Sequence, residues 1–195
     1  LSHGVPVRLL PIPHGLEESA TSMRSRRDGP FCITYLGNAR SEKGFQYLPD
    51  VVAAMRADYL ETGRARFIIQ ANSSMSLEEP LIRHARQRLS AAGEHVELLP
   101  DPLSLAAFHD RLLEADLILL SYDAAKYRRR SSGILVQSIA VGCPLIVPAE
   151  TWMARAAPPG TAEVFQGFDD LPRACMMAVD KLPQLRDAER RAADK

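Results

Sequence analysis

The chain has no excess of charge of one sign, no long apolar segment and few cysteines, and each absence excludes a class of protein. Lys+Arg and Asp+Glu number 24 each among 195 residues, so the chain as a whole lacks the positive charge typical of nucleic-acid binding. No apolar run reaches the length of a membrane span, and we expect no signal peptide before the body of the chain. We therefore expect a cytoplasmic protein with no nucleic-acid partner.

Cysteine is present three times, as Cys32, Cys143 and Cys175. This odd, sparse set argues against a disulfide framework, and two of the three lie in apolar segments, so we expect reduced, buried thiols. No Cys/His spacing suggests zinc, and we expect no metal and no cofactor. Because the chain begins at Leu1 rather than Met, a piece of a longer protein is one interpretation.

Composition and patterning predict one α/β domain. Hydrophobic residues make up 46% and charged residues 25%, which is ordinary for a globular protein of this length. Short apolar segments alternate with amphipathic ones, which favours a doubly wound parallel sheet of the Rossmann-like type. The predicted strands are 31–36, 66–70, 96–99, 117–120 and 144–147, and the predicted helices are 45–61, 77–92, 104–114, 132–141, 169–180 and 182–193, with Pro183 at the last break. We divide the chain into a linker or N-terminal extension (1–30), a Rossmann-like domain (31–182) and a C-terminal helix or tail (183–195).

One segment predicts an anion-binding site. Three arginines, Arg128 to Arg130, lead into Ser131, Ser132 and Gly133, and an apolar helix and a buried strand follow. The first N–H groups of a helix lack intrahelical partners and the helix dipole is positive there, so a phosphate can bind where glycine lets it approach. Gln137 lies one turn further along the same face. In a doubly wound sheet such loops meet at the carboxyl ends of the strands, where ligands bind.

Two motifs resemble those of GT-B fold glycosyltransferases of the retaining, family-four type. Gly133-Ile-Leu-Val-Gln-Ser-Ile-Ala-Val-Gly142-Cys-Pro144-Leu-Ile-Val147 is similar to the family's run x-x-L-E-A-x-A-x-G-x-P-V-V. Ile33-Thr-Tyr-Leu-Gly37-Asn-Ala-Arg-Ser-Glu42-Lys43-Gly44-Phe-Gln-Tyr-Leu48 is similar to V-G-R-x-x-x-E-K-G-x-x-x-L, which opens the C-terminal domain. The resemblance implies the C-terminal, nucleotide-sugar-binding half of a GT-B fold.

By this resemblance, the whole enzyme would transfer a sugar from a nucleotide donor to an acceptor held by an N-terminal domain that this chain lacks. It would retain the anomeric configuration, need no metal, and associate peripherally with membranes in some cases. The resemblance also assigns residues. The catalytic positions are Lys43 and Arg129; the donor or diphosphate contacts are Gly37, Asn38, Arg40, Lys43, Arg128, Ser131, Ser132, Gly133 and Ile134; the ribose or base contacts are Gln137, Leu99 and Tyr122.

The chain departs from the family pattern at three places. Asn38 stands where the family usually has arginine, and Arg40 is the candidate substitute. The family's two glutamates, eight residues apart, are both absent: Gln137 occupies the second position, and the first falls on Arg129, or on Arg130 if Gly133 is the anchor. A glutamine can still bond a ribose hydroxyl, but a carboxylate near the transferred sugar has become a cation.

The sequence leaves one other function class open and disfavours another. A degenerate, non-catalytic nucleotide-binding or assembly domain is compatible with the loss of both glutamates. A dinucleotide-dependent oxidoreductase is disfavoured, because no G-x-G-x-x-G follows the first strand, where Gly37-Asn-Ala-Arg-Ser-Glu stands instead.

Overall fold

A computed structural model describes residues 29–72 and 79–193. Six parallel strands form one sheet in the order β3-β2-β1-β4-β5-β6. The strands are β1 (Phe31–Tyr35), β2 (Ala65–Gln70), β3 (Val96–Leu99), β4 (Leu117–Leu119), β5 (Leu145–Pro148) and β6 (Ala162–Phe165). The predicted doubly wound, Rossmann-like sheet is confirmed. The proposed extension 1–30 lies almost wholly outside the described residues, and the division into domains stays a prediction.

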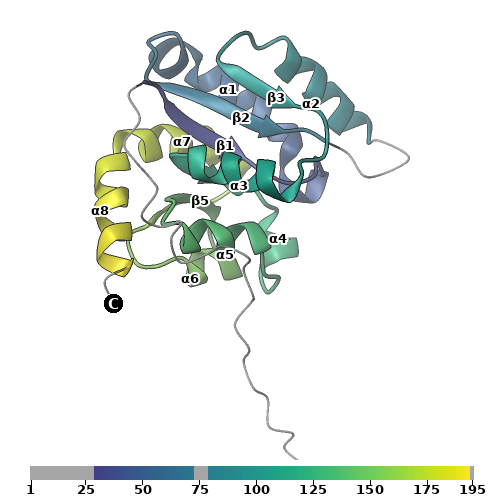
Figure 1. Cartoon of the computed structure of the whole chain (residues 1–195). Helices are drawn as coiled ribbons and strands as arrows, with labels where there is room; N and C mark the ends of the chain where they lie inside the picture. Colours follow the sequence, from purple (N-terminus) through teal and green to yellow (C-terminus); the bar gives the residue numbers. More distant parts are fainter. Residues whose placement is uncertain (1–28, 73–78, 194–195) are drawn as a thin grey trace, which may run out of the picture.

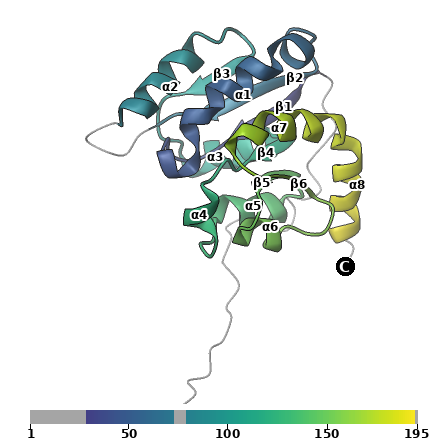
Figure 2. The same cartoon turned by 180° about the vertical axis from the view of Figure 1, so that it is seen from behind.

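Helices cover both faces of this sheet, as two opposite views show (Figures 1 and 2). One face packs under α1 (Leu48–Met55), α2 (Pro80–Ser90), α7 (Leu171–Asp180) and α8 (Leu182–Ala193). The other packs under α3 (Leu105–Glu114), α5 (Gly133–Ala140) and α6 (Trp152–Ala156). Side chains alternate along β1, so that Ile33 and Tyr35 enter the first core while Leu36, just past the strand, enters the second. Strands buried on both faces explain the unbroken apolar runs in the sequence.

Most predicted elements are present within one or two residues of their expected ends. The predicted helix 45–61 is a composite of a 3-10 turn (Phe45–Tyr47), α1 and a π-helical turn (Arg56–Leu60). The last helix breaks at Lys181 rather than at Pro183, which lies in the first turn of α8. Proline is tolerated there because first-turn N–H groups have no intrahelical partner. The sequence analysis missed α4 (Ala124–Tyr127), α6 and β6.

The order of the strands creates one switch point, between β1 and β4. From β1 the chain moves outward through β2 and β3, then returns to the centre at β4 and moves the other way through β5 and β6. The loops that follow β1 and β4 therefore diverge at the carboxyl edge of the sheet, and a crevice opens between them. Both recognised motifs contribute to this place, since one carries the loop after β1 and the other opens the helix after β4.

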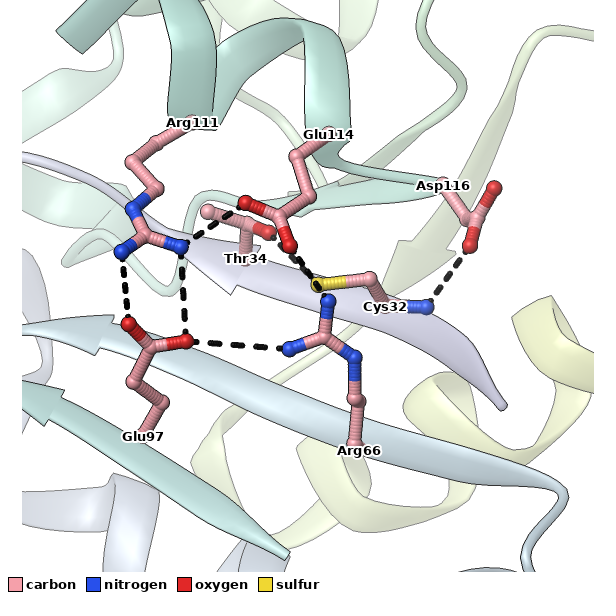
Figure 3. Close-up of polar contacts among 7 residues, drawn as sticks. All are labelled: Cys32, Thr34, Arg66, Glu97, Arg111, Glu114 and Asp116. Atoms are coloured by element: carbon pink, nitrogen blue, oxygen red, sulfur yellow. Dashed lines mark hydrogen bonds and ion pairs between the residues drawn. The ribbon is translucent and has the colours of Figure 1, made fainter. Parts of the chain in front are cut away.

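A network of charged side chains lies on the α3 face of the sheet (Figure 3). Arg66 of β2 pairs with Glu114 of α3 at 2.6 Å, and Arg111 of α3 pairs with Glu114 at 2.8 Å and with Glu97 of β3 at 2.7 Å. Arg66 also lies 3.8 Å from Glu97, which closes a ring of two arginines and two glutamates. These charges link α3 to β2 and β3.

The three cysteines are buried, as expected, and form no disulfide with one another. Burial raises the pKa of Cys32 to about 11 and that of Cys175 well above its ordinary value, so both thiols stay protonated. Among the helices of residues 29–72 and 79–193, none is long and apolar enough to span a bilayer.

Candidate active site

A pocket of about 340 Å³ opens at the switch point. One wall is Lys43, from the loop after β1, and the other walls come from the segment that runs from the end of β4 into α5. The lining residues are Lys43, Tyr122, Tyr127, Ser131, Ser132, Gly133, Ile134 and Gln137. A polar pocket at the carboxyl end of a doubly wound sheet is where such folds bind their ligands.

Lys43 is held in this pocket by its backbone. It ends a 3-10 turn (Ser41–Lys43), and Gly44 leaves that turn in the left-handed region with φ of 70°. A Cβ on Gly44 would stand 1.9 Å from the carbonyl oxygen of Ser121, so the loop can approach the end of β4 only with glycine here. The Ser121 hydroxyl donates to the Lys43 carbonyl at 2.9 Å and fixes the approach.

The Lys43 ammonium lacks a carboxylate partner within the described chain. Its Nζ lies 5.5 Å from the centre of the Tyr122 ring, a cation–π distance, and it makes no ion pair or hydrogen bond with a described residue. Burial lowers the pKa of Lys43, and the nearby Arg40 lowers it further, while Glu42 opposes both effects. A partly desolvated cation of this kind is stabilised when an anion binds beside it.

The first turn of α5 faces the same space. Ser132 caps the helix, and its hydroxyl accepts from the Leu135 N–H at 3.3 Å. A Cβ built on Gly133 would have no heavy atom within 4 Å, so the backbone at this turn is open to a ligand. Helix N–H groups and dipole add positive potential opposite Lys43.

Glu42, which belongs to the first motif but is not a predicted site residue, carries a carboxylate that contacts the pocket lining. It accepts from the Tyr127 hydroxyl at 3.4 Å and from Arg130 at 3.3 Å, and Arg40 lies 3.8 Å away. The guanidinium of Arg130 also stacks over the Tyr127 ring at 5.0 Å. The contacts of Glu42 with Tyr127 and Arg130 join residues 85 and 88 positions apart, and the only sign of them in the sequence is an acidic residue between two cations in a loop.

No protein-family model and no curated protein matches the sequence. Solved structures do match: the C-terminal domain of the group 1 glycosyl transferase LpcC of Francisella tularensis aligns over 91% of this chain and 90% of its own length, with a TM-score of 0.64 and 11% identity. This chain has the fold of a GT-B glycosyltransferase C-terminal domain.

Two longer solved structures also align with this chain. Anabaena HepE in complex with UDP matches 84% of this chain with a TM-score of 0.62 and 13% identity, and a trehalose-6-phosphate structure from E. coli bound with UDP-2-fluoro glucose matches 88% with a TM-score of 0.66 and 12% identity. The alignments cover 44% and 40% of those chains, so the present chain spans less than half their length.

The predicted site residues fall into two groups in this GT-B domain. Seven of them line the pocket: Lys43, Ser131, Ser132, Gly133, Ile134, Gln137 and Tyr122. Gly37 lies directly behind it, because a Cβ there would stand 2.8 Å from the Lys43 Nζ and 3.1 Å from the Ile134 Cδ1. The roles of these residues toward a donor stay predictions.

The remaining predicted residues lie outside the lining. Asn38 accepts through its side chain from Asn72 at 2.8 Å, and Arg40 faces Glu42. Arg128 and Arg129 are exposed, and the Arg128 carbonyl accepts from Arg155 at 2.7 Å. Leu99 ends β3, and its carbonyl accepts from the Ala71 N–H.

Two buried amides of the GT-B domain that sequence reasoning missed support the loop after β1. The Gln70 side chain accepts from the Gly37 N–H at 2.7 Å, and Asn72 bonds Asn38 and, through its carbonyl, the Ala39 N–H. Both stand at the end of β2, directly beside that loop.

Within the described ranges, no three His, Cys, Asp or Glu side chains form a group that could hold a metal ion.

Proposed function

We propose that this chain is the donor-binding half of a glycosyltransferase and that its pocket holds the diphosphate of a nucleotide sugar. One observation carries the proposal: a partly buried Lys43 ammonium, which has no ion-pair partner among the described residues, faces the open N-terminal turn of an eight-residue helix across the pocket. This arrangement concentrates positive potential from two sources on one small volume, which suits a diphosphate.

The proposed roles follow the position of each side chain. Lys43 and the N–H groups at Gly133 and Ile134 would stabilise the charge of the departing diphosphate. Gln137, one turn along α5, would bond a ribose hydroxyl, and Tyr122 would form the wall behind Lys43. Arg128 and Arg129, exposed on the approach to the pocket, would attract the anionic donor.

The aligned structures support this ligand class. HepE holds UDP and the E. coli structure holds UDP-2-fluoro glucose, and both align with this chain over most of its length. By the same likeness, we propose an N-terminal acceptor domain as partner, a cytoplasmic location for the whole enzyme, peripheral contact with a membrane in some settings, and no need for a metal ion.

Calorimetric titration with UDP, GDP, ADP and their sugars tests the proposal. At least one nucleoside diphosphate should bind, NAD should not, and binding should persist in excess EDTA.

Lys43→Ala should weaken nucleoside diphosphate binding by roughly 1.5–3 kcal/mol, the typical contribution of a charge-assisted hydrogen bond, with little change in folding. Lys126→Ala removes an exposed lysine of the neighbouring helix α4 and should leave the affinity unchanged. NAD binding without nucleoside diphosphate binding would reject this function.

A non-catalytic nucleotide-binding domain is the second candidate. The observation that favours it is the absence of a carboxylate at the positions of Arg129 and Gln137, where the resembling family carries glutamates. Such a domain would bind a nucleotide sugar, yet the full-length protein would neither transfer nor hydrolyse it. A labelled-donor assay of the full-length protein separates the two functions.

A further inference from the structure

We propose that Glu42 determines specificity, making the pocket prefer an intact nucleotide sugar over the nucleoside diphosphate left after transfer. This inference rests on the proposed function and adds to it a charge-based discrimination between substrate and product.

The Glu42 carboxylate lies at the rim of the pocket and is held loosely. Its partners are Arg130 at 3.3 Å, the Tyr127 hydroxyl at 3.4 Å and Arg40 at 3.8 Å. A well-formed hydrogen bond between a guanidinium and a carboxylate measures about 2.7–2.9 Å, so neither arginine is bound at full strength. The Glu42 side chain keeps 23% of its surface exposed.

The negative charge of Glu42 acts on groups that line the pocket. Glu42 is the chain neighbour of Lys43, and its oxygen accepts directly from Tyr127 of the lining. Burial raises the pKa of Tyr122 to about 12 and also raises that of Tyr127, and the Glu42 charge adds to both increases. The same charge partly offsets the lowering of the Lys43 pKa by burial and by Arg40. An anion in the pocket would therefore meet the repulsion of this carboxylate.

The two ligands differ in charge where they meet the site. A nucleotide sugar carries about two negative charges, because both of its phosphates are esterified on their outer sides. A free nucleoside diphosphate gains most of a third charge, since the second ionisation of its terminal phosphate has a pKa of about 6. Three cations gather at this rim (Lys43, Arg40 and Arg130), and Glu42 cancels one of them. The additional negative charge of the nucleoside diphosphate consequently meets the Glu42 carboxylate rather than a free cation.

The discrimination depends on the difference between the ligands rather than on the total charge. Any carboxylate at this position repels the more highly charged ligand more strongly. Loss of Glu42 should therefore tighten the binding of both ligands and should favour the nucleoside diphosphate more. A modest preference of this kind would speed product release while the donor stays bound long enough to react.

The test is a comparison of Glu42→Gln with wild type by titration at pH 7.5. The ligand pairs are UDP with UDP-glucose, GDP with GDP-mannose and ADP with ADP-glucose, and the pair that binds wild type is used. In Glu42→Gln, the ratio of the two dissociation constants (nucleoside diphosphate over nucleotide sugar) should fall on the order of threefold, as expected for a unit charge several ångströms away in partly exposed surroundings. Glu42→Ala repeats the charge change without the amide.

Glu61→Gln is the matched control. Glu61 is exposed, pairs with Arg56 at 3.8 Å, and lies just before β2 at the opposite edge of the sheet, so its replacement changes the net charge equally but should leave the ratio unchanged. An unaltered or increased ratio in both Glu42 variants overturns the inference while the proposed function stands. If none of the pairs binds wild type, the proposed function fails and this inference fails with it.

Discussion

Gly44 directly follows Lys43 of the pocket lining and Gly133 belongs to the lining itself, and each is a glycine for a different physical reason. At Gly44 the backbone is left-handed and a methyl group would collide with the Ser121 carbonyl. At Gly133 a methyl group would meet no protein atom within 4 Å. The first glycine serves the folded loop, and the second leaves space that a ligand can use.

Gly44→Ala should lower the free energy of unfolding by about 3 kcal/mol or more, because left-handed strain and a backbone clash act together. Gly63→Ala is the control, since Gly63 has the same φ of 70° but nothing within 4 Å of an added Cβ. It should lose only about 1–2 kcal/mol from the strain. Urea denaturation of both variants gives the difference, and equal losses would show that the contact with Ser121 is irrelevant.

Gly133→Ala should leave folding intact and weaken nucleoside diphosphate binding on the order of tenfold, since the methyl group occupies space that the phosphate needs. The melting temperature should hold or rise slightly, because alanine favours a helix more than glycine does. Gly167→Ala is the control, because it adds a methyl group in equally open space on extended backbone outside the pocket. The affinity of this variant for the nucleoside diphosphate should match that of wild type. Undiminished affinity in Gly133→Ala would place the phosphate elsewhere.

At the scale of elements, helix α3 is attached to the outer strands through charge (Figure 3). Burial disfavours the ionised form of Glu114, but hydrogen bonds from Arg66 and Arg111 outweigh it and hold the pKa of this carboxyl below its ordinary value. A depressed pKa contributes stability above the pKa of the unfolded chain, and that contribution is lost as the pH falls through the folded value.

Glu114→Gln should therefore destabilise the protein at pH 7 and lose less stability than wild type as the pH falls from about 5 to 3. Asp101→Asn, which removes an exposed carboxylate outside this network, should keep the wild-type pH profile. Urea midpoints measured across this range test the difference. Parallel curves for wild type and Glu114→Gln would show that the ring of charges adds no pH-dependent stability.

Periodicity predicted the strands that are buried on both faces, because their apolar runs have no other explanation. It missed β6, whose sequence Ala-Glu-Val-Phe mixes a charge into four residues at the edge of the sheet and follows Pro158, Pro159 and Gly160. It also missed the four-residue helix α4, which depends on Asp123 capping two N–H groups. These two elements are fixed by their neighbours rather than by a repeating pattern.

The candidate site was partly predictable for the same reason. Motif order placed Lys43 and the Gly133 turn at one edge of the sheet, and the structure brings them to one pocket. Tyr127, Glu42, Gln70 and Asn72 are not among the predicted site residues. Their long-range contacts cross 33 to 88 positions of sequence, so they appear only once the loops after β1, β2 and β4 are assembled.

At the scale of the whole molecule, the described chain contains one sheet, and a GT-B active site is a cleft between two domains. Much of the rate of a two-substrate reaction comes from holding both reactants together. We therefore expect this chain alone to bind a donor yet transfer no sugar, with only trace hydrolysis of the donor by water. A labelled-donor assay with glycan and lipid extracts measures this. Robust transfer that Lys43→Ala abolishes would show that one domain suffices.

The switch point has a mechanical consequence. The ladder between β1 and β4 pairs two positions, against five between β1 and β2, and it joins the half of the sheet that carries Lys43 to the half that carries α5. A diphosphate bound by both halves would connect them across the short β1–β4 ladder and would oppose movement of one half relative to the other. Ligand binding should therefore slow hydrogen exchange at amides along β1 and β4, including amides that do not line the pocket. The ligand would then stabilise the pairing of these two strands.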